Sequence, residues 1–170
     1  MPSTRKATPN IASVLSGLGK IDFVDATAID LPQHTEAIDF CYGVLSSTPM
    51  WVTKLLDLRD FLMSPFGLHH QQHISSKKAD LIKPGARLGP FTVLSVNPDE
   101  ILLGDDDWHL SFRTSFAIRS ITDGCEGVCT TAVRVHGIFG RAYLYGIVPF
   151  HRLLIPYLLA RSSTRSAPTK

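Results

Sequence analysis

The stretch "AYLYGIVPFHRLLIPYLLA", residues 142–160, decides how the rest of the chain is interpreted. It has nearly the length of apolar sequence that a membrane-spanning helix needs, about 20 residues. His151 and Arg152 lie at its centre, where a charged side chain costs about 2.5–3.5 kcal/mol on insertion scales. We therefore expect a buried helix in a soluble protein, without a membrane span.

This predicted helix is apolar over a broad face. One stripe at helical spacing contains Tyr143, Ile147, Phe150, Leu154 and Leu158. The adjacent stripe contains Leu144, Val148, His151, Ile155 and Leu159. The opposite side carries Tyr145, Arg152 and two prolines, at 149 and 156, which remove backbone hydrogen bonds and predict a bend.

The sequence before this segment follows the two-residue period of β-strands. In "WHLSFRTSFAIRSI", residues 108–121, one face holds Leu110, Phe112, Phe116 and Ile118. The other face holds His109, Ser111, Arg113 and Ser115. Residues 90–98 and 100–106 predict a hairpin around Asn97–Asp99, and 128–137 predicts a returning strand. These strands form an antiparallel meander.

A first strand is predicted at residues 21–29, and two short helices follow it. The second, within 47–67, would turn Trp51, Leu55, Leu58 and Leu62 to one apolar side. We therefore predict an α+β fold with helices on one face of a curved sheet. Residues 1–20 are expected to form a flexible arm, 21–162 a single domain and 163–170 a disordered basic tail.

Composition excludes several classes of protein. The net charge is only +2, and neither the first ten nor the last ten residues carry an acid, so the middle of the chain is mildly acidic. A nucleic-acid-binding face is therefore not expected. Three cysteines, 41, 125 and 129, do not make a disulfide framework, which favours reduced thiols in the cytoplasm. No continuous apolar run follows Arg5 and Lys6, which argues against a signal peptide.

Two groups of residues resemble metal sites. Asp105–Asp107 with His109 could bind a divalent ion, but glycine and aspartate also favour turns between strands. His69 and His73 have the spacing of one helical turn, but no acidic third ligand lies near them in the sequence. We expect neither a metal nor any other cofactor.

Other polar residues are candidates for contacting a ligand. Pattern alone leaves open which face of 108–119 lines a cavity, and we expect the polar face, with His109 and Arg113, to be turned to solvent. His151 would be a core residue first and an acid–base or ligand-contacting group second, with Tyr143 near it. Arg59 would form a surface ion pair first and hold a ligand second.

Four stretches carry a family resemblance: "PMWVTKLLDLRDFLMSPFGL", "KPGARLGPF", "DDDWHLSFR" and "CTTAVRVHGIFGRAYLYGIVPFHRLLI". They resemble an uncharacterised bacterial family, domain of unknown function 2867, from about Ile21 to Arg161. This family is grouped with the helix-grip proteins of the START and polyketide-cyclase kind, the SRPBCC superfamily. The resemblance implies a curved sheet wrapped around the long C-terminal helix, with a hydrophobic cavity between them, and implies no assigned reaction.

Three functions remain open. The leading hypothesis is binding of a small hydrophobic molecule. The second is a cofactor-free cyclase- or hydratase-like enzyme that uses His or Tyr side chains in the cavity, and the third is an accessory subunit of a separate reductase. The residues expected to line the cavity are Trp51, Leu55, Arg59, His109, Arg113, Tyr143, Ile147, Phe150 and His151. The oligomeric state stays open, a homodimer included.

Overall fold

The computed structural model describes residues 3–15, 17–54, 82–122 and 124–165. Its strands are β1 (Thr4–Lys6), β2 (Phe23–Leu31), β3 (Arg87–Leu88), β4 (Phe91–Asn97), β5 (Glu100–Asp106), β6 (Leu110–Ile121) and β7 (Gly124–Val135). Its helices are α1 (Ile11–Leu15), α2 (Ala37–Ser46) and α5 (Gly137–Arg165), and residues 50–54 are also helical.

The strands form one antiparallel sheet in the order β1-β2-β7-β6-β5-β4-β3. The predicted meander is confirmed, because β4 to β7 follow one another along the chain and in the sheet. The strand predicted at residues 21–29 is β2, which lies two residues later, at Phe23–Leu31, and pairs with β7. The α+β fold class is therefore confirmed.

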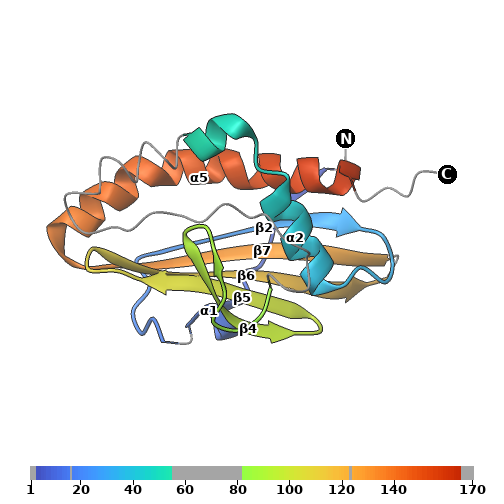
Figure 1. The fold of residues 1–170 in the computed structure, drawn as a ribbon, viewed down its shortest axis with the longest axis horizontal. Coiled ribbons are helices and arrows are strands. Elements are labelled where there is room, and N and C mark those ends of the chain that lie inside the picture. Colours follow the sequence, from blue (N-terminus) through green and yellow to red (C-terminus); the bar gives the residue numbers. More distant parts are fainter. Residues whose placement is uncertain (1–2, 16, 55–81, 123, 166–170) are drawn as a thin grey trace.

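The long helix α5 lies across one face of the sheet, with α2 beside its C-terminal part (Figure 1). The main core lies between these two helices and the sheet. Its fully buried members include Ile101, Leu103 and Leu159. Burial of such side chains stabilises the layer by about 1.5–3 kcal/mol each.

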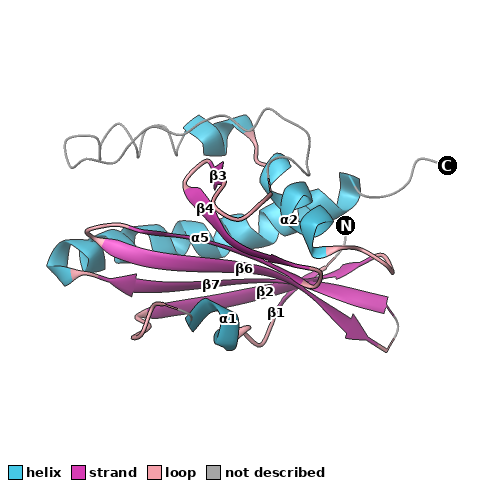
Figure 2. Ribbon diagram, turned by 60° about the horizontal axis from the view of Figure 1, so that its bottom comes forward, coloured by secondary structure: helices cyan, strands magenta, loops and turns pink. Residues whose placement is uncertain are grey.

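In the described part of the chain, the N-terminal residues lie against the sheet. β1 pairs with β2, and α1 covers the face of the sheet opposite to α5 (Figure 2). Val14 and Leu18 are fully buried there against Leu102. Helices therefore cover both faces of the sheet, where we predicted one.

A polar cluster holds this N-terminal segment in place. The Glu100 carboxylate accepts hydrogen bonds from Asn10 Nδ2 (2.7 Å), Ser13 Oγ (2.6 Å) and Ser115 Oγ. The backbone N–H of Asn10 donates to Thr130 Oγ1 at 3.1 Å. The N-terminal segment is therefore held by contacts with residues distant in the sequence, which no local sequence pattern predicts.

Helix α5 is less buried than its sequence predicts. It continues through Pro149 and Pro156 to Arg165, so the tail expected at 163–170 begins as helix. Only its sheet-facing side is covered, and Leu158 and Leu159 are its buried leucines. The helix is long and apolar enough to cross a membrane by length and composition, but its mean hydropathy of 1.2 is modest and a single helix of this kind is weak evidence for a span.

Candidate functional site

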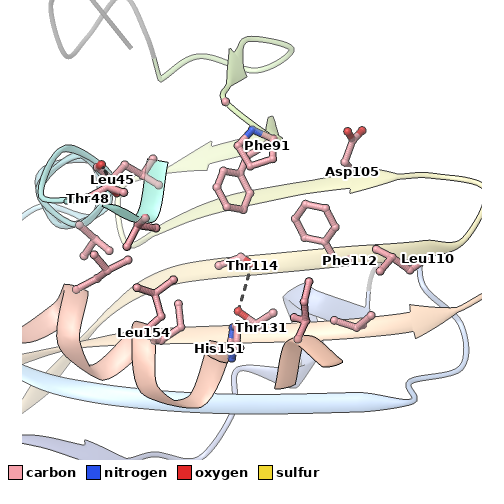
Figure 3. A pocket seen from close by; sticks show the side chains of 18 of the residues that line it. Leu45, Thr48, Phe91, Asp105, Leu110, Phe112, Thr114, Thr131, His151 and Leu154 are labelled. Atoms are coloured by element: carbon pink, nitrogen blue, oxygen red, sulfur yellow. Dashed lines mark hydrogen bonds between the residues drawn. The ribbon is translucent and has the colours of Figure 1, made fainter. Parts of the chain in front are cut away.

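A cavity of about 300 Å³ lies between α5 and the sheet (Figure 3). Strands β4 to β7 supply its floor: Phe91, Asp105, Leu110, Phe112, Thr114, Phe116, Thr131 and Val133. Helix α5 supplies its roof: Tyr143, Leu144, Ile147, His151, Leu154, Ile155 and Leu158. Val44, Leu45, Thr48 and Val52 lie at the α2 end. The lining is therefore mostly aliphatic and aromatic, as in sites that bind small molecules.

The alternation of β6 determines which of its residues enter the cavity. Residues directly opposite each other in neighbouring strands share a face. Phe112 is paired with Val133, and Thr114 with Thr131, and all four line the cavity. The even-numbered side chains of β6 therefore point to α5, and the odd-numbered ones point to α1.

One row of polar side chains crosses the apolar floor. Thr114 Oγ1 and Thr131 Oγ1 are hydrogen-bonded at 3.3 Å (Figure 3). Asp25 on β2 is the sheet partner of Thr131, and so it extends the row towards β1. His151 reaches this row from α5, with its Nδ1 3.9 Å from Asp25 Oδ2.

His151 is largely buried, and its Nδ1 has no hydrogen-bond partner in the described part of the chain. Burial lowers the pKa of His151, because the surrounding side chains cannot solvate a charged imidazole. The negative charge of Asp25 raises the pKa of His151. The positive charges of Arg152 and of Lys6, which forms an ion pair with Asp25, lower it further. The imidazole is therefore kept neutral beside a carboxylate.

A pH dependence of stability follows from this lowered pKa. Below about pH 6.5 the unfolded chain protonates His151 more readily than the folded chain does, so stability falls as the pH drops towards the folded pKa. In His151→Gln this contribution is absent. The free energy of unfolding, measured by urea titration at pH 7.5 and 5.5, should therefore fall more in the wild type than in the variant. Equal losses in the two proteins would contradict this prediction.

A second polar group lies near the N-terminal end of α5. His109 is buried, and its Nδ1 is 3.3 Å from Asp107 Oδ2. The ring of Tyr143 meets the His109 ring edge to face, with centroids 5.0 Å apart. All three side chains line the cavity. A carboxylate, an imidazole and a phenol are groups of the kind that transfer protons, and here they lie close together.

The three consecutive aspartates each have a different neighbour. Asp105 pairs with Arg87 (3.0 Å) and Asp106 with Arg113 (2.9 Å), and the hydrogen bond from Arg113 lowers the pKa of Asp106. Asp107 Oδ1 accepts a hydrogen bond from the backbone N–H of Trp108 at 2.6 Å. The backbone N–H of Asp107 donates to the Leu110 carbonyl oxygen at 2.9 Å, which closes the turn between β5 and β6. Within the described ranges, no three acidic, His or Cys side chains gather where they could hold a metal ion. His69 and His73 lie outside those ranges.

The structure brings together four of the residues that we expected in a cavity. His109, Tyr143, Ile147 and His151 line it. Whether a ligand touches them stays a prediction.

Three other candidates point elsewhere. Arg113 is buried on the opposite face of the sheet, where it pairs with Asp106 under the N-terminal segment. Arg113 is therefore neither in the cavity nor in solvent, whereas His109, just before β6, lines the cavity. Trp51 and Phe150 are 55% and 57% exposed and do not line the cavity. Leu55 and Arg59 lie outside the described residues.

Sequence reasoning missed several polar residues of the site. Thr114 was detectable, because it stands between Phe112 and Phe116 on the face that turned out to be inside. Asp25 had no such signal, since only the pairing of β2 with β7 brings it near His151.

Two of the three cysteines are in surroundings that disfavour thiol chemistry. All three are buried and free. Burial raises the pKa of Cys129 to about 12 and that of Cys41 well above its usual range. The thiolates of Cys41 and Cys129, the reactive form, are therefore scarce at neutral pH.

The chain was compared with known protein families, and one family matches it. Residues 18–158 match the model of the family described as "Protein of unknown function (DUF2867)". The chain belongs to the DUF2867 family. The matched region contains every residue that lines the cavity, whereas β1 and α1 precede it. No protein of curated function matches the chain.

Proposed function

We propose that this DUF2867 protein is a helix-grip protein that binds a small hydrophobic molecule in the cavity between α5 and the sheet. The order of the elements supports a relationship with helix-grip proteins of the START and polyketide-cyclase kind. The first strand of the matched region pairs with the last, α2 lies between that strand and the meander, and α5 closes the chain across the sheet. The three free cysteines are consistent with a reducing compartment such as the cytoplasm.

The cavity itself carries the proposal. Its volume of about 300 Å³ is at the lower end of the range of roughly 300–1,000 Å³ found for small-molecule sites. Apolar walls favour an apolar ligand, because transfer out of water contributes about 25 cal/mol per Å² of buried surface. Thr114, Thr131 and His151 can orient a single hydroxyl, carbonyl or similar group.

Native mass spectrometry of the protein as purified tests this proposal. We expect a fraction of the protein to carry one small molecule, which organic extraction removes. The emptied protein should then take up the uncharged fluorescent probe N-phenyl-1-naphthylamine at one site per chain. A protein that carries nothing and takes up no probe would contradict ligand binding.

A second candidate function is cofactor-free acid–base catalysis, of the cyclase or hydratase kind. The specific observation in its favour is the contact between His109 and Asp107 at 3.3 Å, beside Tyr143. In such a reaction His109 would take a proton from the ligand, and Asp107 would hold the imidazole in the required orientation.

Docking to a separate reductase, the third hypothesis, would need an exposed apolar surface. The far side of α5 carries one, but its composition favours a different partner.

The variant His109→Gln separates binding from catalysis. If His109 performs a reaction, the variant should accumulate substrate in its cavity while the wild type retains product. Mass spectrometry of the extracted molecules would then find two different compounds. The same compound in both proteins would exclude this role for His109, and binding alone would remain.

A further inference from the structure

Helix α5 has a second apolar face, turned away from the sheet. This outer face consists of Ile138, Tyr145, Pro149, Phe150, Leu153 and Tyr157. Ile138, Leu153 and Tyr145 are 88%, 75% and 74% exposed. Their spacing of seven or eight residues places them along one line of the helix. Isolated exposed apolar residues are common, but a continuous apolar face is a sign of an interaction site.

Tryptophans extend this face at both of its ends. Trp108 stacks on Phe139 near the start of α5, with ring centroids 5.1 Å apart. Near the end of α5, the ring centroids of Trp51 and Tyr157 are 6.4 Å apart. Both tryptophans are about half exposed. Tryptophan and tyrosine are enriched where a protein meets the membrane–water interface, because their rings are apolar and their N–H or O–H groups are polar.

The charge of α5 has one sign. The helix contains no aspartate or glutamate, and its arginines at 141, 152 and 161 are exposed. The guanidinium of Arg152 lies at the β2 side of the helix, 5.9 Å from the ring centroid of Phe23. A second copy of the chain, packed α5 against α5 about a two-fold axis near Leu153, would bring Arg152 close to its own symmetry mate. Like charges at such a contact oppose association. Anionic phospholipid headgroups would instead complement the arginines.

We propose that the outer face of α5 docks on the surface of a bilayer that contains anionic phospholipid. The helix lies parallel to the membrane, with the outer face in the boundary between headgroups and acyl chains and the arginines among the phosphates. It does not cross the membrane, because Leu158 and Leu159 on its other side are buried in the core. This inference does not depend on whether the cavity binds a ligand.

Flotation with vesicles tests the proposal on the full chain. Wild-type protein should float with vesicles of phosphatidylcholine and phosphatidylglycerol, and less with phosphatidylcholine alone or at high salt. The double variant Tyr145→Glu/Leu153→Glu should bind at least about tenfold more weakly. Arg152→Glu should reduce the preference for anionic lipid, and Arg141→Glu/Arg161→Glu should reduce it further. The control Leu94→Glu changes an exposed leucine on the opposite side of the sheet, and its binding should equal that of the wild type.

Circular dichroism and urea unfolding are to be measured on every variant, so that loss of folding is separated from loss of docking. The proposal is overturned if the wild type floats with no vesicle, or if the folded double variant floats as well as the wild type does. It is also overturned if the outer face serves a protein instead. Self-association that the double variant abolishes, without any vesicle binding, would show a second copy there.

Discussion

Replacing Gly140 with alanine is expected to destabilise the protein by about 1–3 kcal/mol, the usual range for inserting a group into a filled core. A Cβ at this position would lie 1.9 Å from the carbonyl oxygen of His109. That oxygen is held in place, because it accepts a hydrogen bond from the backbone N–H of His136 at 2.8 Å. The start of α5 must therefore move away from the sheet, and with it the roof of the cavity.

The same substitution should have the opposite effect at Gly146, six residues further along α5. Nothing lies within 4 Å of a Cβ there, and alanine is a better helix former than glycine by about 1 kcal/mol. Urea unfolding of Gly140→Ala and Gly146→Ala at pH 7.5 compares the two effects within one helix. Equal or greater stability of Gly140→Ala relative to the wild type would show that α5 does not touch the backbone at His109.

Narrowing the cavity is expected to weaken ligand uptake. Ile147 projects from α5 into the cavity, and tryptophan at this position would extend further into the 300 Å³ that is free. The affinity for N-phenyl-1-naphthylamine should fall at least about tenfold in Ile147→Trp, since the probe must compete with the indole for the same space. Stability should hold or rise, because the added group enters an existing void.

The matched control is Phe150→Trp, three residues along the same helix. Phe150 is exposed and does not line the cavity, so probe titration should return the wild-type affinity. If Ile147→Trp binds the probe as tightly as this control does, the probe occupies another site and the account of the cavity fails.

The strands could be predicted from the sequence because their signal is local. The alternation in 108–121 and the turn at Asn97–Asp99 correctly placed β6 and the β4–β5 hairpin. What each face of a strand packs against could not be predicted in the same way. Arg113 and Ser115 read as solvent-facing, yet the N-terminal segment covers them, and that cover depends on contacts such as Asn10 to Glu100 across 90 residues.

The exposure of α5 illustrates a second limit. Both sides of the helix are apolar, so periodicity cannot distinguish the side that meets the sheet from the side that does not. Phe150 was assigned to the inner stripe and lies outside, whereas His151, its neighbour, lines the cavity. The absence of acidic residues from α5 was visible in the sequence, and it acquires meaning only once the outer face is known to be exposed.

The most direct test of the central claim, that the void under α5 holds a ligand, is to locate a bound probe by nuclear magnetic resonance. Methyl-labelled protein saturated with N-phenyl-1-naphthylamine should give intermolecular Overhauser effects to the methyl groups of Ile147, Leu154 and Val133, which line the cavity. Effects confined to Ile138 and Leu153, on the outer face of the same helix, would contradict the claim.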